Sequence, residues 1–292
     1  MVSGFPEVAG ESQALAVYRS GRGGQRLPPK LDLFGVGVSA TDSYDEVVSQ
    51  VIAAAHDRRP LTVSALSVHA LMMAATEPQM RRSLVSADIV TTDGQPVRWA
   101  MNALHGAGLR ERVCGPELML RVCEAAAREG VPIYLYGSLP KVLRPLVANL
   151  RARWPSLRIV GAHPSRMRER SFPPSVDEDF DRDDVERIKM SGARLVFIGL
   201  GCPLQEMWAV AQRERLGMPA LCVGAAFDFH AGLKQRAPAF MQRLGLEWAY
   251  RLAQDPRRLI GRYAKYNSQF LLHLARALFA PRAMQPLLPS AR

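Results

Sequence analysis

The sequence has little cysteine, and the cysteines are not spaced for metal binding or disulfide bonding. Its 292 residues include Cys114, Cys123, Cys202 and Cys222, with no Cys-x-x-Cys pair and no histidine pair nearby. Zinc sites and disulfide frameworks normally show such close spacing. The sequence therefore predicts neither, and it is typical of a protein that works in a reducing cytoplasm.

Long apolar runs are also missing. No stretch reaches the ~20 apolar residues that a membrane-spanning helix needs, and the longest run near the C-terminus, residues 270–280, contains His273 and Arg276. Residues 1–30 lack the continuous apolar segment of a signal peptide and are rich in glycine and proline. We expect them to form a mostly disordered arm.

Two nucleotide fingerprints are absent as well. No Gly-x-Gly-x-x-Gly follows a predicted strand with an acidic partner downstream, and no Gly-x-x-x-x-Gly-Lys-Ser/Thr occurs. Both absences argue against dinucleotide oxidoreductases and P-loop NTPases.

Positive charge is concentrated near the C-terminus. The formal net charge is +11, and the segment from Lys234 onward carries many lysines and arginines against only Glu247 and Asp255. Its pattern is helical, with breaks expected near Pro238, Gly245 and Pro256. We predict a basic amphipathic helical appendage over 234–280 and a tail over 281–292. Such charge implies an acidic partner, which could be membrane phosphate, nucleic acid or a substrate diphosphate.

Strand-like and helix-like patterns alternate through the rest of the chain. This alternation is typical of βαβ units, which build a mostly parallel sheet with helices on both faces. We therefore predict an α/β, Rossmann-like domain over 31–233. Strands are expected at 61–66, 87–92, 131–137, 157–163, 193–201 and 219–227, and helices at 67–84, 95–104, 115–130, 140–154, 183–192 and 203–217.

The segment 162–183 interrupts this alternation. It is rich in proline and charge and is predicted to be a mobile surface loop. Its Asp-rich triplets at 177–179 and 181–183 resemble a metal-carrying Asp-x-Asp, but they follow no strand. We expect them to be solvated charges.

Polar residues follow most of the predicted strands. In an open parallel sheet, ligands bind beyond the carboxyl ends of the strands. The topology would therefore bring these residues towards one crevice. They are Ser67 and His69, Asp93 and Gly94, Gly137 and Ser138, the turn from Gly201 to Gln205 and Glu206, and Asp228 with His230.

Asp93 lies on a glycine-containing turn at a strand end. A carboxylate there could act as a general base, because a rigid turn would hold it at the crevice. It could also simply cap the helix that follows. The two roles are compatible, and the local pattern does not separate them.

Two further features suit a phosphate-bearing ligand. The helix expected after Gly201 would expose backbone N–H groups that bind anions, although an ordinary strand–turn–helix joint has the same pattern. Arg112 precedes a Gly-Pro helix start, where a guanidinium would suit a diphosphate, although it could be a solvated arginine.

Asp228 and His230 admit three uses: a metal pair, an acceptor for a nucleotide hydroxyl, or a structural hydrogen-bonded pair. The metal is the least favoured of these, because two ligands without a third make a poor site. No resident metal is predicted.

Together these motifs resemble the WecG/TagA/CpsF family of bacterial glycosyltransferases over about residues 60–275. The similarity lies in DGQPVRW, RVCGPEL, GLGCPLQEMW, AAFDFHAGLKQRAP and LGLEWAYRLAQDPRRLIGRY. The run from Gly224 to Arg262 is the longest and most specific part.

The resemblance implies transfer of an N-acetylmannosamine-type sugar from a UDP-sugar co-substrate, with inversion and without a metal or other cofactor. The acceptor would be a polyprenyl-diphosphate-linked saccharide at the cytoplasmic face of the bacterial membrane, where the protein would bind peripherally. Asp93 would be the base. Substrate-binding residues would include Gly94, Gln95, Arg112, Gln205, Phe227, Arg236, Arg251, Arg258 and Arg262.

The sequence departs from the family pattern at several positions. Ala65, Leu66 and Ser67 stand where Thr-x-Asn is usual, Glu117 replaces an Asp, Leu204 a Lys and Ala226 a Gly. Because Ala65 and Ser67 follow the first sheet strand, a different sugar or reduced activity stays open.

Two other classes of function are considered. A soluble nucleotide-sugar epimerase or dehydrogenase would need the missing dinucleotide fingerprint. A nucleic-acid-binding protein would use the basic appendage and its tyrosines but leave the crevice residues without a role, so no nucleic acid is expected. A homo-oligomer is possible. An apolar surface of Trp248, Leu252, Leu259, Tyr263, Phe270 and Leu274 would let the appendage act as a membrane-facing lid or, alternatively, pack on the domain.

Overall fold

The computed structural model describes residues 26–165 and 178–279. Its main sheet has the order β4-β3-β8-β7-β5-β6, and all neighbouring strands in it are parallel. Strands β1 and β2 form a separate antiparallel sheet, and β2 lies against β4. The strands are β1 (Lys30–Leu33), β2 (Val36–Ser39), β3 (Leu61–Leu66), β4 (Ile89–Thr92), β5 (Ile133–Gly137), β6 (Ile159–His163), β7 (Leu195–Gly199) and β8 (Pro219–Cys222).

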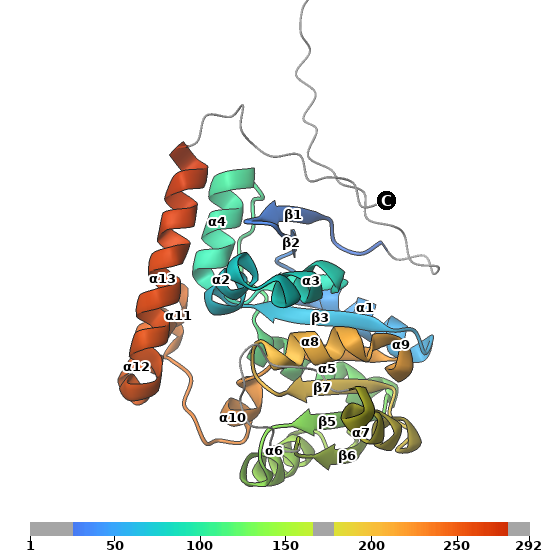
Figure 1. Ribbon diagram of the computed structural model, residues 1–292. Coiled ribbons are helices and arrows are strands. Elements are labelled where there is room, and N and C mark those ends of the chain that lie inside the picture. The colour runs from blue at the N-terminus through green and yellow to red at the C-terminus, as the bar shows by residue number, and fades with distance from the viewer. Residues whose placement is uncertain (1–25, 166–177, 280–292) are drawn as a thin grey trace, which may run out of the picture.

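Helices connect these strands, and the described chain after β8 is helical (Figure 1). They are α1 (Tyr44–His56), α2 (Val68–Thr76), α3 (Pro78–Ser86), α4 (Gln95–His105), α5 (Gly115–Glu129), α6 (Pro140–Arg153), α7 (Glu178–Met190), α8 (Leu204–Ala211), α9 (Arg213–Leu216), α10 (Ala226–His230), α11 (Ala239–Arg243), α12 (Glu247–Gln254) and α13 (Pro256–Phe279).

Both faces of the main sheet are covered by helices. Along β7, Leu195 and Phe197 belong to a core shared with α1, α5, α6 and α10, whereas Val196 and Ile198 belong to a core with α7, α8 and α9. Successive side chains of a strand point to opposite faces, so a strand buried on both sides becomes a continuous apolar run. The predicted α/β fold with a mostly parallel sheet is confirmed.

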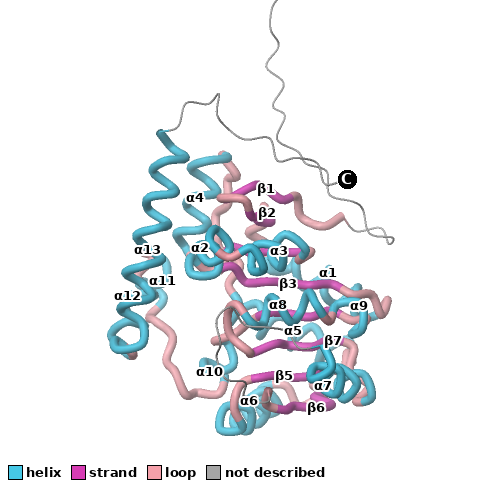
Figure 2. Tube along the Cα trace, in the orientation of Figure 1, coloured by secondary structure: helices cyan, strands magenta, loops and turns pink. Residues whose placement is uncertain are grey.

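The C-terminal helices pack on a third core. This core joins α2, α3 and α4 to the β1–β2 sheet, and Phe270 of α13 contributes to it. Figure 1 shows α13 running beside α4 and α2, on the side towards which the carboxyl ends of β3, β5 and β7 point. The tube in Figure 2 shows the loops after these strands on that same side. No helix in the described ranges is long and apolar enough to cross a bilayer.

Several predicted elements differ in detail. The helix expected over 67–84 divides at Glu77, because Pro78 begins a new helix there. The strand expected over 219–227 ends at Cys222, and Ala226–His230 form α10. The helix expected over 203–217 divides into α8 and α9. The three breaks expected in the appendage are present, since separate helices begin next to Pro238, Gly245 and Pro256.

Two expectations about polar segments need correction. Part of the predicted disordered arm is ordered, because Pro28 is buried and Lys30 begins β1; residues 1–25 lie outside the described residues. Within the predicted loop 162–183, helix α7 already begins at Glu178, and Asp181 is buried rather than solvated. Residues 166–177 of that loop lie outside the described residues.

Candidate active site

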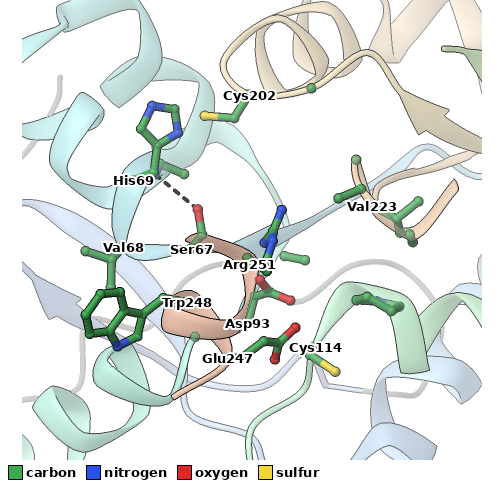
Figure 3. A pocket seen from close by; sticks show the side chains of 18 of the residues that line it. Ser67, Val68, His69, Asp93, Cys114, Cys202, Val223, Glu247, Trp248 and Arg251 are labelled. Atoms are coloured by element: carbon green, nitrogen blue, oxygen red, sulfur yellow. Dashed lines mark hydrogen bonds between the residues drawn. The ribbon is translucent and has the colours of Figure 1, made fainter. Parts of the chain in front are cut away.

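A cavity of about 1110 Å³ lies beyond the carboxyl ends of the sheet strands. Residues that follow β3, β4, β5, β7 and β8 line it, and α12 and α13 close one side. Figure 3 shows Asp93, Glu247 and Arg251 grouped near its centre, with Cys202 and Val223 on other walls. The crevice expected from the topology is thus present, and the appendage forms part of its wall.

Most of the predicted site residues meet in this cavity. Those that line it are Ser67, His69, Asp93, Gly94, Gln95, Arg112, Ser138, Gly201, Gln205, Glu206, Asp228, Arg251, Arg258 and Arg262.

Gly137, Phe227 and Arg236 do not line the cavity. Gly137 has φ +100°, and a Cβ there would lie 3.0 Å from the backbone carbon of Gly199, so the close approach of β5 and β7 requires glycine. The Phe227 ring is buried against Gly199. Arg236 lies behind the wall, where it contacts Cys114 and Gln242. These residues support the site rather than face a ligand.

The Asp93 carboxylate does not cap the helix that follows it. Gly94 is the N-cap of α4, and no side chain caps that helix. Asp93 Oδ1 instead accepts a hydrogen bond of 2.8 Å from the Gly115 N–H, at the start of α5. Burial raises the pKa of the carboxyl above its usual 3.8, while the Arg112 charge and the Gly115 bond oppose that rise. A carboxylate with a raised pKa is a stronger base.

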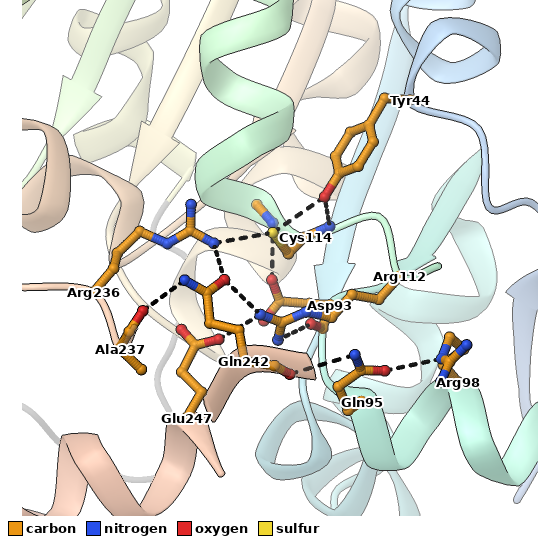
Figure 4. A network of polar contacts seen from close by, with 11 residues as sticks. Tyr44, Asp93, Gln95, Arg98, Arg112, Cys114, Arg236, Ala237, Gln242 and Glu247 are labelled. Atoms are coloured by element: carbon orange, nitrogen blue, oxygen red, sulfur yellow. Dashed lines mark hydrogen bonds and ion pairs between the residues drawn. The ribbon is translucent and has the colours of Figure 1, made fainter. Parts of the chain in front are cut away.

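Arg112 is held in a polar network rather than in solvent. Its guanidinium donates to the Asp93 carbonyl oxygen at 3.0 Å and to Glu247 of α12 at 2.5 Å. Gln242 accepts from Arg112 at 3.3 Å and from Arg236 at 2.9 Å (Figure 4). Burial alone would lower the pKa of Arg112, but the Glu247 and Asp93 charges raise it. The network ties the appendage to the strand end that carries Asp93.

His69 is neutral at physiological pH. Burial, together with the charges of Arg262 and Lys265, lowers its pKa to about 4. Its ring meets the edge of Tyr266 at a centroid distance of 4.6 Å. Ser67, two residues before His69, caps α2 by accepting a hydrogen bond of 3.3 Å from the Ala70 N–H. A neutral imidazole has one N–H donor and one nitrogen acceptor, so His69 can hydrogen-bond to a ligand without carrying a charge.

Asp228 and His230 do not form a pair. Asp228 faces the cavity and forms a 3.3 Å ion pair with Lys234, whereas the His230 ring contacts the Pro116 carbonyl oxygen at 2.8 Å. The hypothesis that Asp228 and His230 form a structural hydrogen-bonded pair is therefore wrong. Among the described residues, no three His, Cys, Asp or Glu side chains come together as a metal site. Asp228 remains available as an acceptor for a ligand hydroxyl.

The three appendage arginines reach the cavity from two helices. Arg251 lies on α12, and Arg258 and Arg262 lie on α13, which begins at Pro256. The break expected near Pro256 separates Arg251 from the other two, yet all three line the cavity. The predicted apolar surface is also divided, because Leu259 and Phe270 are buried, and Phe270 belongs to the core with α2, α3 and α4.

Some residues that line the cavity have no local signal in the sequence. Glu247, Lys141 and Trp99 line the cavity but were not predicted to do so. Glu247 lies within a segment similar to the family pattern, which is the one signal that could have identified it. Lys141 lies in the first turn of α6, just after the predicted Gly137-Ser138 turn.

The fold and the cavity define an α/β protein whose ligand site combines a buried carboxylate with several arginines. A family model described as the glycosyl transferase WecG/TagA/CpsF family matches residues 31–284. The chain belongs to this family of glycosyltransferases, which act in cell-surface polysaccharide synthesis.

Proposed function

We propose that the protein transfers a hexose derivative, such as an N-acetylmannosamine-type sugar, from a UDP-sugar to a polyprenyl-diphosphate-linked saccharide. One observation carries this proposal: the Asp93 carboxylate, whose pKa burial raises, shares a cavity with the guanidinium groups of Arg112, Arg251, Arg258 and Arg262. Such a site offers a base for an acceptor hydroxyl and cations for a leaving diphosphate.

The reaction is a single displacement. Asp93 takes the proton of the acceptor hydroxyl as that oxygen attacks the anomeric carbon. The bond from this carbon to the diphosphate oxygen breaks on the opposite side, which inverts the anomeric centre. The electron pair leaves with the diphosphate of UDP, whose added charge the arginines stabilise. A neutral His69 and the Asp228 carboxylate can position hydroxyl groups of either substrate.

A donor screen tests this proposal. Purified protein is incubated with UDP-sugars that differ in the sugar and with a lipid-diphosphate-linked acceptor, and released UDP is measured. We expect release with one class of UDP-sugar, and only when the acceptor is present. Ala65 offers a methyl group to the cavity where the family usually has a threonine, so the panel includes sugars with and without an acetamido group. Acceptor-independent or absent release across the panel would refute the proposal.

The membrane surface is the expected place of action. Leu244 after α11 and Ile260 of α13 are exposed large apolar side chains, with 61% and 60% of their surface accessible. Neither lines the cavity; Arg243 precedes Leu244, and Arg257, Arg258 and Arg262 flank Ile260 in the sequence. A basic surface with apolar side chains binds at a membrane interface through both charge and apolar burial. The protein would therefore associate peripherally with the inner face of the cell membrane.

We expect the double substitution Leu244→Gln and Ile260→Gln to weaken binding to anionic vesicles by roughly tenfold, because two apolar side chains no longer enter the interface. Vesicle co-sedimentation measures this loss. Activity on a water-soluble acceptor analogue should be unchanged. Met190→Gln is the control, because Met190 is 86% exposed but lies at the end of α7. Equal vesicle binding by the double variant and the wild type would contradict a membrane role for this surface.

A further inference from the structure

Glu206 is a buried carboxyl group in the cavity wall that no cation neutralises. It lies in the first turn of α8 with 2% of its surface exposed, and no ion pair among the described residues includes it. Its Oε1 accepts a 2.8 Å hydrogen bond from Gln205 Nε2. Its Oε2 has no hydrogen-bond partner in the described part of the chain. Burial raises the pKa of Glu206 to about 7, so a large fraction carries a proton at neutral pH.

The side-chain carbonyl oxygen of Gln205 is a hydrogen-bond acceptor that no donor among the described residues satisfies. Because its Nε2 is committed to Glu206, the orientation of the amide is fixed, and Oε1 is left without a partner among the described residues. Gln205 is itself 5% exposed and lines the cavity. Its Oε1 lies against the Gly224 turn, where an added Cβ would come within 3.1 Å of it. The glycine therefore leaves room beside this oxygen.

The two unsatisfied atoms have complementary chemistry. A protonated Glu206 offers an O–H donor, and Gln205 offers a carbonyl acceptor. Buried polar atoms without partners are costly, which makes a ligand that satisfies both favourable. A phosphate presents only acceptors and negative charge, so it would satisfy the donor but not the acceptor. The backbone N–H of Gln205 is also occupied, since it donates to the Gly201 carbonyl oxygen at 3.0 Å.

The surroundings of Glu206 are uncharged at the point of contact. The thiols of Cys202, before α8, and Cys222, on β8, act on its carboxyl, and burial raises the pKa of both thiols, which keeps them neutral. Strand β3 contributes the Ser64 hydroxyl, which, like the Gln205 amide and the Cys202 thiol, opposes the rise in the pKa of Glu206 without outweighing burial. Strand β7 has no charged residue. The charged residues of the helices packed on α8 are Arg81 and Arg82 of α3, and Arg213, Glu214 and Arg215 of α9 beyond its far end.

We propose that Gln205 and Glu206 form a neutral acceptor–donor pair that recognises a C(=O)–N–H unit of the sugar nucleotide rather than its phosphates. This inference rests on the proposed function, because it assumes a UDP-sugar in the cavity. Two parts of such a ligand carry the unit: the imide edge of uracil and an acetamido group on the sugar. In both cases the N–H donates to Gln205, and the carbonyl oxygen accepts from Glu206.

Calorimetric binding of three probes between pH 6 and 8.5 tests the pair: UDP-N-acetylglucosamine, UDP-glucose and inorganic pyrophosphate. The wild-type affinity for a recognised UDP-sugar should fall by up to about tenfold across this range, because Glu206 loses the proton that it donates. In Glu206→Gln the amide N–H₂ donates at every pH, so the affinity should stay high and the pH dependence should disappear. Any pH dependence that comes from Asp93 would persist in Glu206→Gln, so this variant distinguishes titration of Asp93 from titration of Glu206.

Glu206→Leu removes the donor and should weaken the recognised UDP-sugar roughly tenfold at pH 6 while leaving pyrophosphate unchanged. Weakening of both UDP-sugars assigns the pair to the uracil imide, and weakening of UDP-N-acetylglucosamine alone assigns it to the acetamido group. Equal pH dependence in the wild type and Glu206→Gln, or a flat wild-type profile, would overturn the proposal even if Glu206→Leu fails to fold. If neither UDP-sugar binds the wild type, the proposed donor is wrong and this inference falls with it.

Discussion

Asp93→Asn should lower turnover by roughly 10²–10⁴-fold, the usual contribution of a general base. The asparagine Oδ1 can still accept the Gly115 N–H bond that Asp93 makes at the start of α5, so the local geometry is retained. The amide cannot take a proton from the acceptor hydroxyl. Steady-state release of UDP measures the loss, with Asp45→Asn, an exposed carboxylate of α1, as the control.

Asp93→Asn should not lower the stability of the fold, although it lowers turnover. Because burial raises the pKa of Asp93 above 3.8, the folded protein holds this proton more tightly than the unfolded chain does. The wild type therefore loses stability as the pH rises from about 4 through the raised pKa, and the cost is constant above it. Asp93→Asn does not carry this cost. Its free energy of unfolding should match or exceed that of the wild type at pH 8, with the difference shrinking towards pH 4.

Chemical denaturation at several pH values measures this second effect. An inactive variant that is equally or more stable would show that Asp93 serves the reaction rather than the fold. A variant with near-normal turnover would leave Asp93 as a structural acceptor for the Gly115 N–H. A variant that is both inactive and strongly destabilised at pH 8 would contradict the assignment of the raised pKa to burial.

Much of the main sheet could be predicted because its strands leave a strong local signal. A parallel strand buried on both faces, such as Leu195–Gly199, is a short apolar run between turn residues. The strands β1 and β2 have four residues each and pair around the tight Phe34-Gly35 turn. They were not predicted, because such short strands resemble loops in a single sequence.

The cavity could be located, but its internal contacts could not. Topology brings the carboxyl ends of parallel strands to one edge, which is why Ser67, Asp93 and Ser138 meet. The hydrogen-bond partner of each side chain could not be predicted in this way. The Asp93 carboxylate bonds to Gly115 rather than to its own helix, and Arg112 pairs with Glu247 from a helix far along the chain. No periodicity or spacing records contacts between such distant residues.

Positive charge in the cavity comes chiefly from the appendage. Arg112 is matched by Glu247 at 2.5 Å, with 12% and 16% of the two side chains exposed. Arg251, Arg258 and Arg262 line the same cavity. Burial lowers the pKa of Arg262, and the charges of Arg251 and Arg258 lower it further. Arg251 and Arg258 therefore repel Arg262 when no ligand is bound, although Arg258 also pairs with Asp255. A bound diphosphate would relieve that repulsion.

Replacing Arg251, Arg258 and Arg262 together with alanine should lower kcat/KM by on the order of 10²–10³-fold, the usual effect of removing groups that stabilise a developing oxyanion. Each single substitution should cause a smaller loss. The affinity for UDP should fall as well, because its diphosphate loses its counter-charges. Kinetics on a water-soluble acceptor analogue separates this effect from membrane binding. Arg257→Ala is the matched control, since Arg257 is exposed on the same helix and does not line the cavity.

The fold should tolerate the triple substitution, because it removes repulsion on Arg262 and leaves Phe270, Tyr266 and Leu274 to hold α13 against the domain. An unchanged or higher melting temperature, with UDP no longer raising it, is the expected result. Retention of both UDP affinity and kcat/KM within about twofold of the wild type would show that the appendage arginines do not bind the diphosphate. In that case Arg112 would have to bind the diphosphate instead. Its ion pair with Glu247 would then have to break whenever a UDP-sugar binds.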